Sequence, residues 1–115
     1  MSYSILKIYS STTDKVGSSL LYEHIVYLAK NKGISGVTVY RGIMGFGMSS
    51  ASISSTKFWE LTEKLPVMIE IIDDTARLEE FYSIIEPELL AMPKGCLVSM
   101  EPVEIKLQKP GKEKK

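Results

Sequence analysis

The stretch LPVMIEIIDD, residues 65–74, restricts the fold of this chain more than any other segment. Its apolar residues alternate as they do in a strand, with Ile69 and Ile71 on one face and Met68 and Ile72 on the other. A strand that is apolar on both faces needs packing partners on both sides of its sheet. The segment therefore predicts a strand whose two faces must both be covered.

The other segments follow in the order strand, helix, strand, strand, helix, strand. Two strand–helix–strand units with right-handed crossovers place both helices on one face of the sheet. This order predicts an α+β fold, the ferredoxin-like βαββαβ sandwich, and we expect an extra C-terminal edge strand. The strands are predicted at residues 3–10, 36–42, 65–74 and 94–100, with the edge strand at 102–107.

The length of 115 residues suits a single domain. We expect that domain over residues 1–107, followed by a flexible lysine-rich tail over residues 108–115. The segment TKFWELTEK, residues 56–64, fits either a strand or a helical turn, and its aromatic residues favour a strand.

The ends of both helices carry local signals. Ser18 or Ser19 is expected to cap the first helix, because a serine hydroxyl can accept a hydrogen bond from a free backbone N–H. Asp73 or Asp74 is expected to cap the second helix in the same way. Pro87 is expected to kink or end that second helix.

The predicted sheet has one face without a helical cover. Met68, Ile72 and Tyr40 lie on that face, opposite the residues that pack under the helices. A large uncovered apolar face usually marks association. We therefore expect an oligomer in which sheets pack against one another.

Residue counts argue against several classes of function. Basic and acidic residues number 14 each, so the net charge of zero gives no general reason to expect nucleic acid as a partner. One cysteine, Cys96, and one histidine, His24, favour neither a disulfide nor a Cys–His nucleophile nor a metal site. Cys96 lies in an apolar run and is expected to be buried. We find no catalytic motif and no signal peptide, so we expect a cytoplasmic protein that is not an enzyme.

A glycine-rich stretch, TVYRGIMGFG, follows the second predicted strand. Gly42, Gly45 and Gly47 allow a ligand to approach the backbone, and Arg41 could bind a phosphate. The stretch lacks the Lys-Ser/Thr of a phosphate-binding P-loop and the glycine order of a dinucleotide fingerprint. Composition alone leaves two interpretations open, a binding loop and a flexible hairpin connection.

The same residues carry a family resemblance. GISGVTVYRGIMGFG resembles the stretch that leads into the mobile loop of PII nitrogen-regulatory signal proteins, and LPVMIEIIDD resembles their next strand. From Tyr3 to about Leu107 the chain is similar to the small, largely uncharacterised PII-like family. The resemblance implies a ferredoxin-like homotrimer that binds adenine nucleotides in the clefts between subunits, at the base of the mobile loop.

The resemblance also implies a set of ligand-binding residues. The chain departs from PII proteins in this set, since Val67 stands where they have a lysine and Lys106 where they have paired arginines. The reduced positive charge favours AMP or ADP over a triphosphate with a bridging magnesium ion, and no metal ligand is assigned. The implied ligand-binding residues are Arg41, Gly42, Gly45, Phe46, Gly47, Glu70 and Lys106.

These expectations combine into a non-enzymatic signal protein. Its ligand would order residues 43–56, and a partner protein such as a membrane transporter would recognise that loop. Met44 and Phe46 could instead insert into a partner. Two alternatives remain: a CutA-like trimer involved in divalent-cation response, and an enzyme that acts on a nucleotide.

Overall fold

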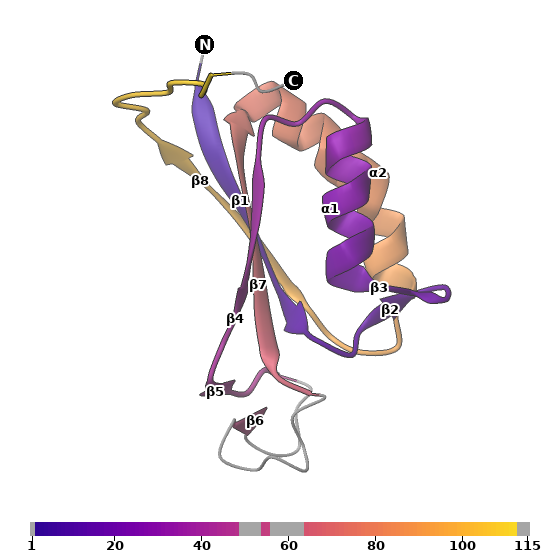
Figure 1. The fold of residues 1–115 in the computed structure, drawn as a ribbon. Helices are drawn as coiled ribbons and strands as arrows, with labels where there is room; N and C mark the ends of the chain where they lie inside the picture. The colour runs from indigo at the N-terminus through magenta and orange to yellow at the C-terminus, as the bar shows by residue number, and fades with distance from the viewer. Residues whose placement is uncertain (1, 49–53, 56–63, 113–115) are drawn as a thin grey trace.

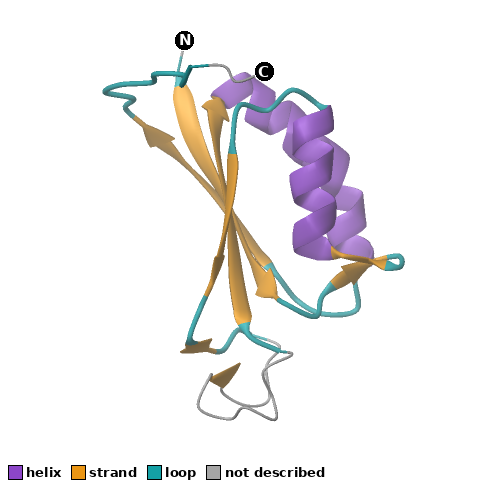
Figure 2. Cartoon of the chain, viewed as in Figure 1, coloured by secondary structure: helices purple, strands orange, loops and turns teal. Residues whose placement is uncertain are grey.

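The computed structural model describes residues 2–48, 54–55 and 64–112 (Figure 1). Four antiparallel strands form one sheet in the order β4-β7-β1-β8, and both helices cover the same face of it (Figures 1 and 2). This arrangement confirms the ferredoxin-like prediction. The main elements are β1 (Tyr3–Ser11), α1 (Leu21–Asn31), β4 (Val37–Arg41), β7 (Pro66–Asp74), α2 (Thr75–Ala91) and β8 (Leu97–Val103).

β1 and β7 are the two inner strands. β1 pairs with β7 over its whole length, from Tyr3 opposite Asp74 to Ser11 opposite Pro66. It pairs on its other side with β8, where Tyr3 lies opposite Val103. Because β7 and β8 both run antiparallel to β1, they begin at the same end of the sheet.

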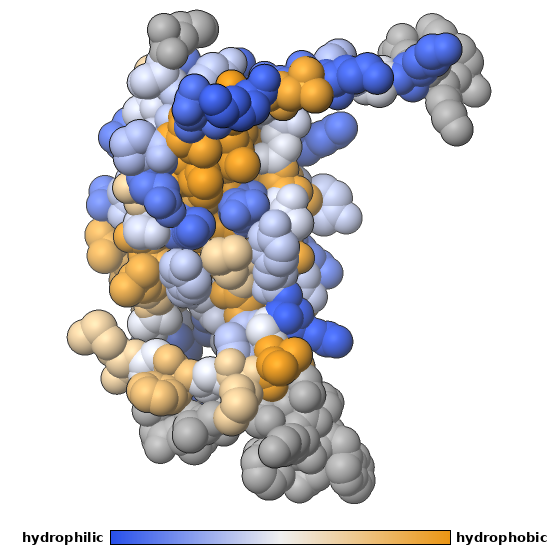
Figure 3. All heavy atoms as spheres, turned by 90° about the vertical axis from the view of Figure 1, so that its left-hand side faces the viewer, coloured by the Kyte–Doolittle hydropathy of each residue, from blue (hydrophilic) through white to orange (hydrophobic). Residues whose placement is uncertain are grey.

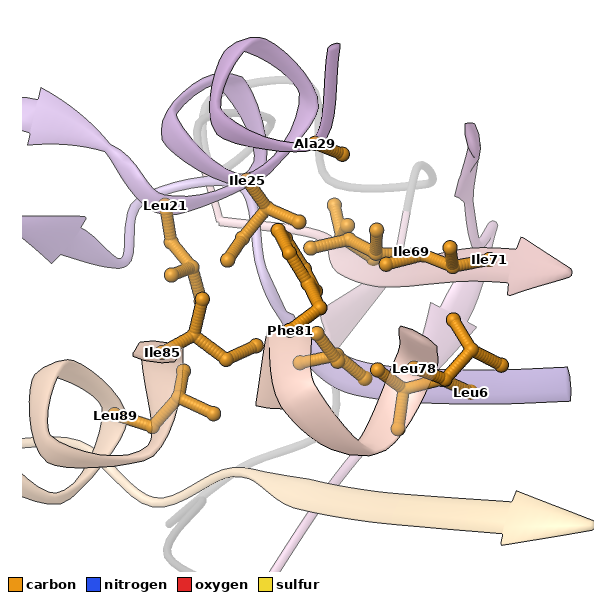
Figure 4. Close-up of a cluster of buried hydrophobic side chains, with 12 residues drawn as sticks. Leu6, Leu21, Ile25, Ala29, Ile69, Ile71, Leu78, Phe81, Ile85 and Leu89 are labelled. Carbon is orange, nitrogen blue, oxygen red and sulfur yellow. The ribbon is translucent and has the colours of Figure 1, made fainter. Parts of the chain in front are cut away.

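The hydrophobic core lies between the sheet and the helices (Figure 4). Leu78, Phe81, Tyr82 and Ile85 recur at helical spacing in the sequence, which predicts that they form the buried side of the second helix. Leu78, Phe81 and Ile85 lie in this core, where each is at most 2% exposed, whereas Tyr82 is only partly buried. Phe81 occupies the middle of the cluster in Figure 4, between α1 and the sheet. The other labelled core residues are Leu6, Leu21, Ile25, Ala29, Ile69, Ile71 and Leu89.

α1 begins later than the sequence predicts. Neither Ser18 nor Ser19 caps it, because this region forms a small hairpin of β2 (Lys15–Val16) and β3 (Ser19–Leu20). Gly17, with a φ of 62°, makes the turn between these two strands. The helix has no side-chain cap, and its first residue, Leu21, donates its N–H to the backbone carbonyl of Asp14 at 2.7 Å.

α2 agrees with the sequence at its start and differs from it near its end. Asp74 caps the helix by accepting a hydrogen bond from the N–H of Ala76 at 2.9 Å. Pro87 does not end the helix, which continues to Ala91. Leu89 is buried in the core beyond the proline, so packing holds the last turn in place. In the described ranges, neither α1 nor α2 is long and apolar enough to cross a membrane.

The separate edge strand expected at residues 102–107 is absent. Pro102 and Val103 belong to β8, and no strand is present over residues 104–112. The pairing stops there because Val103 already lies opposite Tyr3, the first residue of β1. Residues 56–63 of the ambiguous segment lie outside the described residues, and so do residues 49–53 and 56 of the expected mobile loop.

The sheet face opposite the helices is open, but it is not uniformly apolar (Figure 3). Lys7 forms an ion pair with Glu101 at 3.1 Å, and the Tyr40 hydroxyl donates to Glu70 at 3.1 Å. We call Lys7, Glu70 and Glu101 the charged band. The hydrogen bond and the charge of Glu101 raise the pKa of Lys7, and those of Glu70 raise the pKa of Tyr40.

Candidate functional site

A groove of about 1000 Å³ lies at the end of the sheet where β7 and β8 begin. The last residues of β1 form its floor, and two chain segments form its sides. One side is residues 45–48, which follow β4, and the other is residues 94–97, which follow α2. The groove is therefore built from segments that are distant in the sequence and that the antiparallel sheet brings together.

One part of the groove is apolar. Phe46 and Met48 line it and expose most of their side chains, and Pro66 at the start of β7 lines it as well. Tyr9 completes this wall from β1. Apolar and aromatic surfaces of this kind suit the flat ring of a base or another planar ligand.

A second part of the groove is basic. Lys64 and Lys94 both line it. The pKa of Lys64 is lowered, first by a side-chain hydrogen bond with Lys94 and then by the positive charge of that residue. The charge of Asp14 has a weaker, opposite effect on the pKa of Lys64.

Residues 42–45 lie close to Pro66 at the start of β7, and two glycines make this close approach possible. The N–H of Gly42 donates to the Pro66 carbonyl at 2.7 Å. A Cβ at Gly42 would lie 3.2 Å from the Pro66 Cβ, and a Cβ at Gly45 would lie 3.3 Å from the Pro66 Cγ. Gly45 also belongs to β5 (Met44–Gly45), which pairs with β6 (Ser54–Ser55). Close approach to Pro66 therefore favours glycine at both positions.

The structure brings only some of the expected ligand residues together. Gly45, Phe46 and Gly47 line the groove, and Gly42 contacts Pro66 at its base. Arg41 ends β4 in an exposed position and is not among the lining residues.

Two of the expected ligand residues lie elsewhere. Glu70 lies on the open sheet face, where it lines a smaller hollow of about 340 Å³ with Thr38 and Ile105. Lys106 is exposed and pairs with Glu104 at 3.3 Å. The expected residues therefore do not form one site within a single chain.

The groove also contains residues that the sequence analysis missed. Lys64, Lys94 and Asp14 carry its charges, and Ser10 contributes a hydroxyl that is buried without a hydrogen-bond partner among the described residues. Cys96 was expected to be buried, but it is exposed and lines the groove. Desolvation, followed by the charge of Asp14, raises the pKa of its thiol.

Residues able to bind a metal are scattered. Over residues 2–48, 54–55 and 64–112, no group of three or more His, Cys, Asp or Glu side chains is close enough to hold a metal ion. His24 of α1 instead contacts Glu88 of α2, with 2.9 Å between its Nε2 and the Glu88 Oε1. Asp73 accepts the N–H of Ser35 at 3.0 Å, so its carboxylate has a structural role.

Sequence comparisons give close matches over most of the chain. A family model described as DUF190 (Uncharacterized ACR, COG1993) matches residues 3–105. The UPF0166 protein MJ1524 of Methanocaldococcus jannaschii is 39% identical over 91 residues, which cover 79% of each chain. A UPF0166 protein of Aquifex aeolicus is 31% identical over 101 residues, which cover 88% of this chain and 90% of the relative.

Solved structures give the same fold. CPII, a nitrogen regulatory PII-like protein from Thiomonas intermedia K12 solved with ADP, AMP and bicarbonate, matches with a TM-score of 0.61 at 16% identity. The match covers 90% of this chain and 89% of CPII. A PII-like signaling protein from Thermus thermophilus matches with a TM-score of 0.57 at 14% identity, over 90% and 91% of the two chains. The chain therefore belongs to the DUF190 (UPF0166) family, and its ferredoxin-like sandwich is the fold of PII-like proteins.

Proposed function

We propose that this chain is a non-enzymatic PII-like regulatory protein that binds an adenine nucleotide, AMP or ADP, in clefts between three copies. The observation that carries the proposal is the groove beside the glycine-rich segment, which combines an apolar wall with two lysines. Adenine is flat and apolar on its faces, and the phosphates are anionic, so a nucleotide matches both parts of the groove. CPII, which shares the fold, was solved with ADP and AMP bound.

The open sheet face supports the proposed trimer. Tyr9 and Leu97 are 42% and 53% exposed on this face, next to the groove. Packing this face against another copy would remove their apolar surface from water. Glu70 and Lys106 lie outside the groove of their own chain, and in the trimer they would complete the cleft from a neighbouring copy.

The regulatory part of the proposal concerns residues 43–56. Four large apolar side chains lie on the described part of this segment, and each is more than half exposed. In the proposal, nucleotide binding changes the contacts at the base of this segment, and a partner protein such as a membrane transporter binds its apolar residues. The four residues are Ile43, Met44, Phe46 and Met48.

Calorimetry with AMP, ADP and ATP tests the nucleotide. We expect binding of AMP and ADP and a raised melting temperature in their presence, because a ligand that binds only the folded state stabilises it. Phe46→Ala should weaken binding by about tenfold or more, since stacking of a base on an aromatic ring contributes about 1–3 kcal/mol. Tyr27→Ala, on the exposed side of α1, is the matched control. The nucleotide is excluded if none of the three gives heat or shifts the melting temperature.

A further inference from the structure

The groove contains one buried acidic side chain, Asp14, which the proposed function does not use. Asp14 is 6% exposed and lines the groove, whereas Lys64 and Lys94, which also line it, are both exposed. None of the ion pairs among the described residues includes Asp14. A buried carboxylate outside an ion pair is uncommon in folded proteins, so its presence in the groove needs an explanation.

Hydrogen bonds fix the position of this carboxylate. Its Oδ2 accepts the N–H of Ser11 at 3.0 Å, and the Asp14 N–H donates to the Ser11 carbonyl at 3.3 Å. The Asp14 carbonyl also accepts the N–H of Leu21 at 2.7 Å. These bonds join Asp14 to the end of β1 and to the start of α1, so the carboxylate is held in place when a ligand enters the groove.

The turn itself requires an acceptor but not a negative charge. An asparagine at position 14 could accept the Ser11 N–H through its amide oxygen. The charge of Asp14 nevertheless acts on other residues of the groove. It adds to desolvation in raising the pKa of Cys96, and it opposes the lowering of the pKa of Lys64.

A fixed charge in a groove affects each ligand in proportion to the charge that the ligand carries. The two lysines attract anions, but they are exposed, so water and salt screen their charges. The buried carboxylate repels anions from a fixed position and is screened less. Asp14 therefore reduces the affinity that a ligand gains from each further negative charge.

We propose that Asp14 sets the charge selectivity of the groove, because its carboxylate disfavours ligands increasingly as their negative charge grows. Among nucleotides, it would lower the affinity for ATP relative to AMP. The nucleotide as the ligand rests on the proposed function, whereas the charge selectivity of the groove does not.

The thiol of Cys96 provides a test that needs no nucleotide. The chain has one cysteine, and it is exposed and lines the groove. Its reaction rate is measured with an anionic aromatic disulfide, dithiobis-nitrobenzoate, and with the neutral dithiodipyridine. In both reactions the thiolate attacks the disulfide, forms a mixed disulfide and releases an aryl thiolate. A changed thiol pKa therefore alters both rates alike, and the ratio of the two rates reports the charge of the groove.

Two variants separate the charge of Asp14 from its hydrogen bond. Asp14→Asn keeps an acceptor for the Ser11 N–H and removes the charge, and it should raise the ratio of the anionic to the neutral rate by about threefold. Asp14→Glu keeps the charge and displaces the acceptor, so its ratio should stay near that of the wild type. The matched control is Asp74→Asn, which keeps the cap of α2 and should leave the ratio unchanged.

Calorimetry of the full chain with adenosine, AMP and ATP then tests the choice of nucleotide. Asp14→Asn should strengthen ATP binding relative to AMP binding by about threefold or more, because ATP carries the larger negative charge. Adenosine carries no charge and should bind the wild type and the variant equally.

The outcomes separate the charge selectivity from the nucleotide. An unchanged rate ratio in Asp14→Asn overturns the charge selectivity, whether or not a nucleotide binds. A raised ratio in a chain that binds no nucleotide supports the charge selectivity and overturns the nucleotide function. Equal gains for AMP and ATP overturn the role of Asp14 in choosing between them and leave the nucleotide function standing.

Discussion

Asp73 and Asp74 are neighbours in the sequence, yet the structure predicts very different costs for removing them. The Asp73 carboxylate is buried, with 6% of the residue exposed. Its Oδ2 accepts the N–H of Ser35 at 3.0 Å, and its Oδ1 accepts the N–H of Asp74 at 2.6 Å. The Asp73 carboxylate therefore joins, by hydrogen bonds, the segment that precedes β4 and the junction between β7 and α2.

Asp73→Ala leaves two backbone N–H groups without their acceptor. The two donors are only partly buried, so water replaces part of the lost bonding, and we expect a total loss of about 1–3 kcal/mol. Domains of this size are stabilised by about 5–15 kcal/mol, which makes this a large loss. Asp74→Ala removes one partly exposed cap bond, to Ala76, and should cost about 1 kcal/mol.

Urea unfolding followed by circular dichroism measures both losses at one chain concentration. With an m-value of about 2 kcal/mol per molar urea, Asp73→Ala should lower the midpoint by about 1 M and Asp74→Ala by about 0.5 M. If Asp73→Ala costs no more than Asp74→Ala, the two hydrogen bonds to the buried Asp73 carboxylate do not stabilise the fold as argued.

Two further predictions concern charge and assembly. Lys94→Gln should raise the pKa of Lys64 toward the ordinary lysine value of 10.5, as measured by NMR titration of the lysine side chains. In the wild type the folded chain binds the proton of Lys64 less tightly than the unfolded chain does. The free energy of unfolding should therefore increase as the pH rises from the lowered pKa to 10.5. Lys94→Gln should show a smaller increase. An unaltered Lys64 titration would contradict the proximity of the two lysines. Leu97→Asp on the open sheet face should convert the proposed trimer to monomers in sedimentation, while Tyr27→Asp on α1 should not. Equal behaviour of the two variants would contradict the proposed interface.

Periodicity in the sequence was enough to predict the fold. The alternation that includes Ile69 and Ile71 predicts β7. The spacing of Leu78, Phe81, Tyr82 and Ile85 predicts the buried side of α2, on which Tyr82 is only partly buried. Both patterns are long enough to outweigh local exceptions such as Pro87. The hairpin around Gly17 was missed because strands of two residues have no periodicity to detect.

The groove was only partly predictable. The glycine-rich stretch marks Gly45 and Gly47 in the sequence, but nothing local marks Lys64 or Lys94 as residues that line the same groove. Both lysines line the groove because β7 and β8 both begin where β1 ends, which is a consequence of the strand order in the sheet. Glu70 was grouped with the glycines by resemblance, whereas its place in the middle of β7 puts it on the open face.

The charged band limits which protein surfaces can bind to the open sheet face. Lys7 forms an ion pair with Glu101, and Tyr40 donates a hydrogen bond to Glu70. A second copy could therefore cover the band and leave both of these interactions intact. A foreign surface that pulled Lys7 away from Glu101 would leave a dehydrated ion without its counterion, which is strongly unfavourable. The band would thus favour partners whose contacts leave these two pairs intact, and it would disfavour partners whose groups compete for Lys7 or Glu101.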